Sequence, residues 1–97
     1  MAQDMVWLND VAVPASHAHV SVFDMGFLRG IAAFESLRTY DGHPHALHEH
    51  LNRLWECTRA FGVQALHDDR TVRDQIKQLH ELSGHAELRV NFICTPG

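Results

Sequence analysis

The spacing of hydrophobic residues predicts strands in the first third of the chain. In Met5–Pro14 two short apolar runs flank Asn9–Asp10, a residue pair typical of tight turns. Val20–Phe23 predicts a further strand that enters a turn at Asp24–Gly26, and Gly30 predicts a close approach of two backbones. We therefore expect several short strands before residue 31.

Ile31–Tyr40 is the clearest predicted strand, because its residue types favour a strand and Asp41–Gly42 follows as a turn. Its side chains alternate between two faces. Neither face is wholly apolar, so we expect at least one of them to line a polar cleft. One face contains Phe34, Ser36, Arg38 and Tyr40, and the other contains Ala33, Glu35, Leu37 and Thr39.

The hydrophobic period becomes helical from Leu47 to Phe61, and Gly62 is a natural end for that helix. A second helix is predicted for Thr71–Ser83, with Thr71 and Asp74 as a capping pair and Gly84 after its end. The residues expected to be buried are Leu47, Leu51, Leu54, Thr58 and Phe61 in the first helix, and Val72, Ile76 and Leu79 in the second.

A final strand is predicted within Ala86–Gly97, broken by Thr95–Pro96–Gly97. Strands, two helices and a strand in this order predict an α+β fold, a small two-layer domain whose antiparallel sheet is covered by two helices. On the last strand Leu88, Val90, Phe92 and Cys94 point one way, and Glu87, Arg89 and Asn91 point the other.

Size and charge limit the function classes. A chain of 97 residues is one domain at most, and a net charge of -4 argues against nucleic acid or an anionic membrane as the main partner. No apolar run approaches the ~20 residues of a membrane span, and the first residues lack the features of a signal peptide. Two cysteines without metal-type spacing fit a reducing compartment, so we expect a cytoplasmic protein.

The basic residues are almost all arginines, and Lys77 is the single lysine. At ~100° per residue, Arg53 lies on the shoulder of the apolar stripe of the first helix, with His50 and Cys57 between them. The alternatives for Arg53 are a cleft-lining role and a solvated guanidinium with a packed stem.

Arg38 and Arg89 lie within strands, where a buried guanidinium needs a partner. Ion pairs with Glu35 and Glu87 are one interpretation. An anion site is the other, because guanidinium groups match carboxylate and phosphate oxygens with paired hydrogen bonds. Arg29 would join such a site, and several arginines facing one cleft would suit a ligand with several negative oxygens.

Four histidines, at positions 43, 45, 48 and 50, raise the question of a zinc site. Two of them flank Pro44, and His48 and His50 diverge by about 200° on a helix. We therefore expect no metal site.

Three segments of the chain resemble, in the same order, the N-terminal domain of class IV aminotransferases, the fold-type IV pyridoxal-phosphate enzymes. The segments are VWLND, VSVFDMGFLRGIAAFESLRTYDG and HLNRL. This family includes branched-chain and D-amino-acid aminotransferases and aminodeoxychorismate lyase. The resemblance extends from Val6 to Gly97, and its most specific part is the pair FESLRTYDG and HLNRL.

The resemblance implies roles for five residues. Arg53 matches the arginine that grips the cofactor phosphate, and Phe34 matches an aromatic that walls the substrate pocket. Arg38 and Arg89 match positions that help to hold the substrate carboxylate in branched-chain aminotransferases. Arg29 stands where tyrosine is common, which implies a more cationic pocket edge.

Pyridoxal-phosphate chemistry requires a lysine that forms the Schiff base, and in this family it lies in a second domain. Lys77 is predicted to face solvent, with Glu81 one turn away, so it is a poor nucleophile. Residues 1–97 are therefore expected to be the N-terminal small domain of a longer enzyme, inactive without the C-terminal lysine-bearing domain. Pyridoxal phosphate is expected to bind only when that second domain is present.

The expected activity is transfer of an amino group between an amino acid and a 2-oxo acid, and the family implies a homodimer. Aminodeoxychorismate lyase is an alternative within the family. A free-standing, non-catalytic module that binds a partner or an anion is an alternative from another class.

Overall fold

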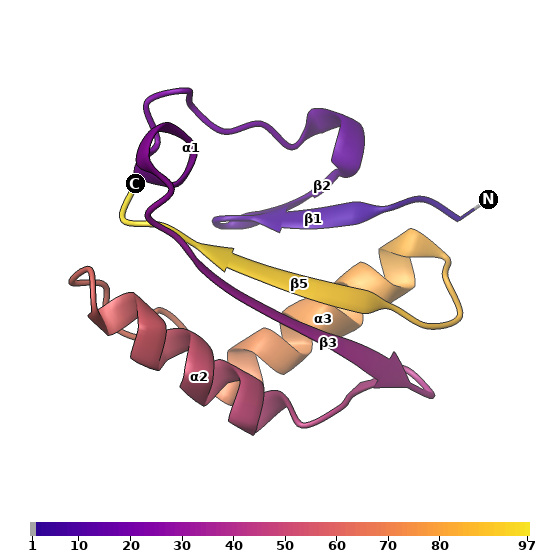
Figure 1. Cartoon of the computed structure of the whole chain (residues 1–97). Helices are drawn as coiled ribbons and strands as arrows, with labels where there is room; N and C mark the ends of the chain where they lie inside the picture. The colour runs from indigo at the N-terminus through magenta and orange to yellow at the C-terminus, as the bar shows by residue number, and fades with distance from the viewer. Residues whose placement is uncertain (1) are drawn as a thin grey trace.

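Strands and helices follow one another in a computed structural model that describes residues 2–97. The first half contains β1 (Met5–Leu8), β2 (Val11–Pro14), the 3₁₀ helix η1 (Ala15–His17), α1 (Met25–Arg29) and β3 (Ala33–Tyr40). The second half contains β4 (His43–Pro44), α2 (Leu47–Arg59), α3 (Asp69–Ser83) and β5 (Arg89–Cys94). The α+β class predicted from the sequence is confirmed (Figure 1).

The strands within residues 2–97 form two antiparallel sheets, whereas the sequence predicted one. β1 pairs with β2, and β3 lies between β4 and β5. The β1–β2 hairpin turns at Asn9, whose positive φ of 56° is one that asparagine tolerates. The hairpin has α3 as its neighbour instead of a strand of the larger sheet (Figure 1).

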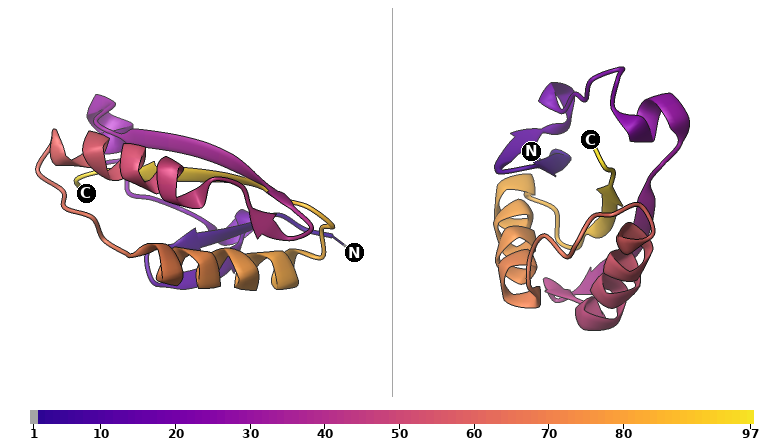
Figure 2. Two further views of the ribbon diagram at one scale, coloured as in Figure 1. Left: turned by 90° about the horizontal axis from the view of Figure 1, so that it is seen from below. Right: turned by 90° about the vertical axis from the view of Figure 1, so that its left-hand side faces the viewer.

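Two helices and the larger sheet share one buried apolar cluster. α2 packs against β3, and α3 contacts both α2 and β1 (Figures 1 and 2). The helical residues of the core recur at three- and four-residue spacing, as the sequence predicted. The buried cluster contains Ala33, Leu37 and Val90 from the sheet, Leu47, Leu51 and Leu54 from α2, and Val72 and Ile76 from α3.

The predicted strand at Val20–Phe23 is wrong, because this segment pairs with no strand and α1 begins at Met25. Asp24 caps the helix, since its Oδ2 accepts a hydrogen bond from the Gly26 backbone N–H at 2.9 Å. The Asp24 cap therefore begins a short helix, MGFLR, at the place where the sequence predicted a turn.

The close approach predicted at Gly30 lies at Gly26 instead. Gly30 ends α1 with a left-handed φ of 70°, and no atom lies within 4 Å of where its Cβ would stand. At Gly26 a Cβ would overlap the methyl group of Thr95. Glycine is thus required at position 30 for its backbone angle and at position 26 for space.

The N-terminal end of α3 differs from the prediction, whereas its C-terminal end agrees with it. Asp68 caps the helix by accepting from the Thr71 N–H at 2.8 Å, so Thr71 and Asp74 are not the capping pair. The prediction started too late because aspartate is as good a cap as threonine. Gly84 follows the helix with a left-handed φ of 73°, as predicted.

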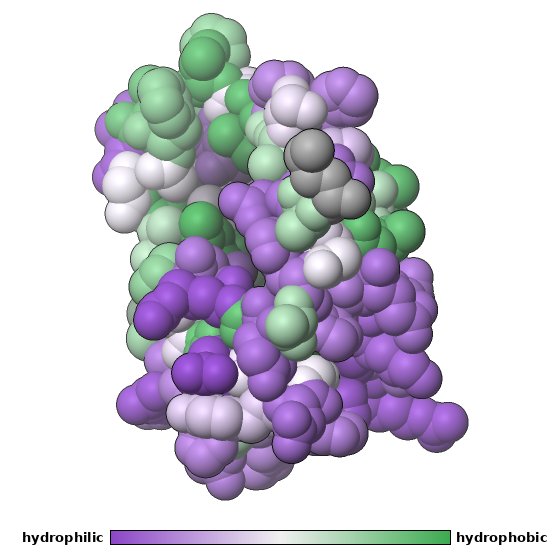
Figure 3. Space-filling model, turned by 90° about the vertical axis from the view of Figure 1, so that its right-hand side faces the viewer, coloured by the Kyte–Doolittle hydropathy of each residue, from purple (hydrophilic) through white to green (hydrophobic). Residues whose placement is uncertain are grey.

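Apolar side chains are exposed around α1. Figure 3 shows hydrophobic residues gathered in the upper part of the molecule, whereas the lower part is mainly hydrophilic. In Figure 1 the segment before α1 lies at that same upper end. No described helix is both long and apolar enough to cross a membrane. The large apolar residues exposed in and before α1 are Val20, Val22, Phe23, Phe27 and Leu28.

Candidate functional site

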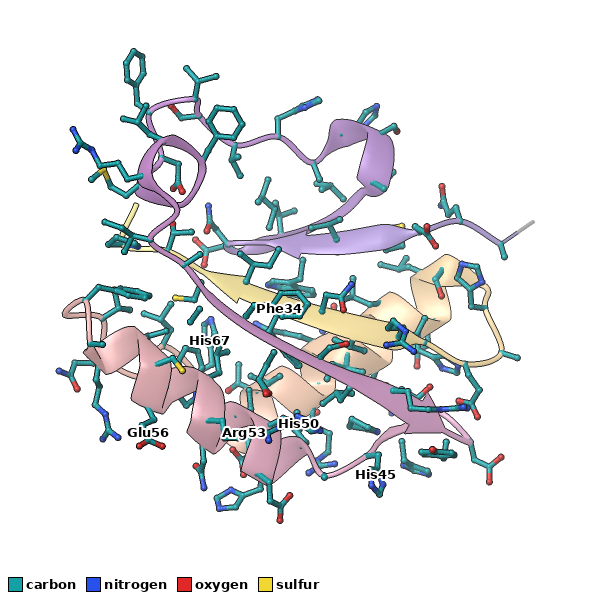
Figure 4. All side chains as sticks on the ribbon, viewed as in Figure 1. Phe34, His45, His50, Arg53, Glu56 and His67 are labelled. Atoms are coloured by element: carbon teal, nitrogen blue, oxygen red, sulfur yellow. The ribbon has the colours of Figure 1, made fainter. Side chains whose placement is uncertain are left out.

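Arg53 on α2 is held by two neighbours, Glu35 of β3 and His50 one turn earlier on α2. Its Nη2 lies 3.0 Å from Glu35 Oε1, 3.2 Å from Glu35 Oε2 and 3.1 Å from His50 Nδ1. His50 Nδ1 is also 3.2 Å from Glu35 Oε2. In Figure 4, His50 and Arg53 lie on the α2 side of β3, whereas Phe34 lies on the other side. We call Glu35, His50 and Arg53 the Glu35–His50–Arg53 cluster.

The cluster runs from buried to exposed. The side chain of Glu35 is 13% exposed and that of His50 is 19% exposed, whereas that of Arg53 is 64% exposed. Every contact of the guanidinium within residues 2–97 uses Nη2, which leaves the N–H groups of Nε and Nη1 without a protein partner. Arg53 is therefore anchored at one nitrogen and can donate to an anion from the other two.

Arg38 and Arg89 lie directly opposite each other on β3 and β5, and both side chains are exposed. The guanidinium of Arg38 lies 4.1 Å from the centre of the Tyr40 ring, and its Nε donates to the Thr39 carbonyl at 3.0 Å. Two like charges in opposed positions destabilise a sheet unless an anion lies between them.

Of the two interpretations of Arg38 and Arg89, the ion pairs with Glu35 and Glu87 do not form in residues 2–97. Glu35 instead pairs with Arg53, because strand alternation places Glu35 on the opposite face from Arg38. Glu87 bonds the turn after β3, as described below. Apart from the Arg38 Nε–H that donates to Thr39, the guanidinium groups of Arg38 and Arg89 therefore keep their donors for another partner.

The candidate residues occupy three places rather than one cleft. Phe34, which is 62% exposed, shares the outer face of the larger sheet with Arg38 and Arg89. Arg53 lies at the α2 side of that sheet, and Arg29 is the last residue of α1. Arg38 and Arg89 line a shallow hollow that includes neither Arg29 nor Arg53. The chain by itself therefore does not bring these arginines together in one cleft.

Glu35 and His50 are the site residues that the sequence did not identify. From the sequence, Glu35 is an available partner for Arg38 or Arg89, and His50 is one of four histidines for which no metal site is expected. The available signal was the three-residue spacing of His50 and Arg53, which places them on one side of a helix. No three His, Cys, Asp or Glu side chains gather as metal ligands in residues 2–97, and His48 contacts Asp69.

Glu87 holds the β3–β4 turn. It accepts hydrogen bonds from the hydroxyl of buried Thr39 at 2.7 Å and from the backbone N–H groups of Asp41 and Gly42. The Thr39 hydrogen bond is the largest cause that lowers the pKa of Glu87 below its ordinary value of 4.5, and the Gly42 N–H adds to it. The charged carboxylate is therefore the form that the fold prefers.

A pH-dependent stability follows from Glu87. Because its folded pKa is lower than its unfolded pKa, its contribution is present above pH 4.5 and is lost as the pH falls through the folded value. We expect Glu87→Gln to unfold at a lower temperature than wild type at pH 7, with the difference shrinking toward pH 3. Thermal unfolding followed by circular dichroism at both pH values measures this. An equal difference at both would show that the charge of Glu87 has no part in it.

No family model matches the chain, but individual proteins of similar sequence are known. Aminodeoxychorismate lyase of Bacillus subtilis is 31% identical over 92 residues, which cover 91% of this chain and 31% of that protein. A fold IV transaminase of Curtobacterium pusillum is 28% identical with a TM-score of 0.73, over 90% of this chain and 31% of the transaminase.

The fold is shared more widely. The branched-chain aminotransferase of the archaeon Thermoproteus uzoniensis, solved with norvaline, superposes with a TM-score of 0.81 at 19% identity. The superposition covers 96% of this chain and 33% of the aminotransferase. The chain thus spans about a third of the length of each of these proteins.

Proposed function

We propose that the chain forms part of an aminotransferase. The support is that its sequence and its fold are similar to those of the N-terminal part of class IV pyridoxal-phosphate enzymes. The enzyme would move an amino group between an amino acid and a 2-oxo acid. The main support within the chain is Arg53, which is anchored through Nη2 and exposes its other N–H groups. Such a donor set fits the oxygens of a phosphate group.

Arg53 would bind the phosphate of pyridoxal phosphate, and when bound the cofactor supplies an electron sink for chemistry at the substrate α-carbon. Phe34 would wall the substrate pocket from the outer face of β3. Arg38 and Arg89 would hold a substrate carboxylate, which would relieve the repulsion between these opposed cations. Arg29 would make the pocket edge more cationic.

The catalytic lysine would come from a second domain, because Lys77 is exposed on α3, where a solvated ammonium group keeps its proton and is a poor nucleophile. The chain would then form one wall of the site, and the cofactor would be bound only together with that second domain. A homodimer in the cytoplasm is the assembly that we propose for the whole enzyme.

Aminodeoxychorismate lyase activity is the second candidate, favoured by the 31% identity to the Bacillus subtilis enzyme of that name. The two activities separate in one assay of the complete enzyme. An amino acid with 2-oxoglutarate tests the first, and aminodeoxychorismate tests the second. A non-catalytic binding module is the third candidate, supported by the exposure of Lys77, and it predicts activity with neither.

The phosphate role of Arg53 is tested by titrating the complete enzyme, freed of cofactor, with pyridoxamine 5'-phosphate, whose amine cannot form a Schiff base with a lysine. We expect Arg53→Ala to raise the dissociation constant at least about tenfold, because a charge-assisted pair is lost. Isothermal titration calorimetry measures the constants.

Arg59→Ala is the matched control, because Arg59 is an exposed arginine on the same helix. It should bind like wild type, and pyridoxamine without phosphate should be insensitive to Arg53→Ala. Equal binding of pyridoxamine 5'-phosphate by wild type and Arg53→Ala would refute the proposed role.

A further inference from the structure

We propose that Glu35, together with His50, positions the guanidinium of Arg53 for an anionic ligand. This inference rests on the proposed function, because it concerns how the phosphate-binding residue is prepared. The supporting geometry is the three-way contact of Glu35 Oε2, His50 Nδ1 and Arg53 Nη2, in which each pair of atoms lies 3.1–3.2 Å apart.

The position of Glu35 in β3 restricts where its carboxylate can lie. It lies on the inner face of β3, between buried Ala33 and Leu37, and pairs in register with Phe92 of β5. A carboxylate that is only 13% exposed requires a cationic or donor partner. Within residues 2–97, the only such partners of Glu35 are Arg53 and His50.

His50 closes the contact from the helix side. Its Nδ1 can donate to Glu35 or accept from Arg53, according to the tautomer. Because His50 precedes Arg53 by three residues, the two side chains leave α2 on the same side. The strand and the helix thus hold the same guanidinium nitrogen.

The consequence is a restricted arginine. A free arginine side chain populates many rotamers, and an anion that binds one of them must overcome the loss of that freedom. Anchoring at Nη2 removes part of that freedom beforehand, while Nε and Nη1 remain available. The apparent dissociation constant is inversely proportional to the population of the binding-competent conformer, so it falls as that population rises.

The negative charge of Glu35, in contrast to its positioning role, weakens anion binding at Arg53. A carboxylate beside the arginine lowers the local positive potential, so its removal by electrostatics alone would strengthen anion binding. Loss of positioning would weaken it. The sign of the change therefore separates a positioning residue from a neutralising one.

The experiment compares wild type with Glu35→Ala and Glu35→Gln in titrations with inorganic phosphate and with pyridoxamine 5'-phosphate. We expect Glu35→Ala to weaken both about fivefold. Glu35→Gln keeps an oxygen acceptor and should lie between Glu35→Ala and wild type. Binding by Glu35→Ala that equals or exceeds wild type would overturn the proposal.

A second readout does not require a ligand. In the ¹⁵N spectrum of wild type, the Arg53 Nε–H group should give a resolved signal of a restricted side chain, identified by its loss in Arg53→Ala. It should move toward the averaged position of free arginines in Glu35→Ala, and partly so in His50→Gln. An unchanged signal in both variants would also overturn the proposal, and backbone amide spectra establish that each variant is folded.

The two readouts distinguish two kinds of failure. If wild type and Arg53→Ala bind both probes equally, the proposed function of Arg53 fails, and the Nε–H signal alone decides whether Glu35 restricts the arginine. If Arg53 is required for binding but Glu35→Ala binds as well as wild type, only the positioning role fails.

Discussion

Replacement of Leu51 by alanine is expected to destabilise the chain by about 2–5 kcal/mol. Leu51 is 1% exposed and belongs to the buried cluster that joins α2, α3 and the larger sheet. Truncation loses the transfer free energy of the removed atoms and leaves a cavity that neighbouring elements cannot fill completely. This loss is a large share of the free energy of unfolding of a typical domain, which is roughly 5–15 kcal/mol.

Urea unfolding followed by circular dichroism measures this loss as a lower midpoint with an unchanged slope. Leu82→Ala is the matched control, because Leu82 is also a helical leucine but is 53% exposed. It should change the unfolding free energy by no more than about 0.5 kcal/mol. Similar midpoints for the two variants would show that α2 does not anchor the core as described.

Gly26→Ala is expected to cost about 1–3 kcal/mol, because the added methyl group overlaps the Thr95 side chain. The contact lies where α1 meets the end of β5. There the Thr95 hydroxyl donates to Asp24 Oδ1 at 3.0 Å, and the Met25 N–H donates to the Gly97 carbonyl at 3.0 Å. An alanine at position 26 would separate α1 from β5 and strain these hydrogen bonds.

A double-mutant cycle with Thr95→Ser tests the cause of this loss. Serine removes the overlapping methyl group and keeps the hydroxyl that bonds Asp24. Gly26→Ala should therefore be better tolerated in the Thr95→Ser background, by at least about 0.5 kcal/mol. Scanning calorimetry of the four proteins measures the coupling. The same loss in both backgrounds would mean that the Thr95 methyl group is not what excludes alanine.

Secondary structure was predictable where one periodicity extended over several turns or strand positions. The core residues of α2 and α3 recur at helical spacing, and the side chains of β3 and β5 alternate as predicted. The prediction failed at α1 because five residues are too few to show a helical period. It also placed the capping residue of α3 too late, because several polar residues in a row can each cap a helix.

The candidate site was predictable in part. The helix position of Arg53 left two roles open, and the phosphate role was predicted only from the resemblance of HLNRL to a known motif. Its partner Glu35 lies 18 residues earlier in the sequence, and acidic residues at similar separations were equally available. The resemblance also grouped Phe34, Arg38 and Arg89, which do share one face of the sheet.

The sequence by itself determined which faces are apolar, where the chain turns and which arginine stands at the edge of a helix. Those properties depend on neighbours within a few residues, so the local pattern contains them. Only the tertiary structure decided that the strands divide into two sheets, that Glu35 and His50 hold Arg53, and that Gly26 is required for space. These depend on contacts between residues far apart in the chain, which form only when whole elements pack together.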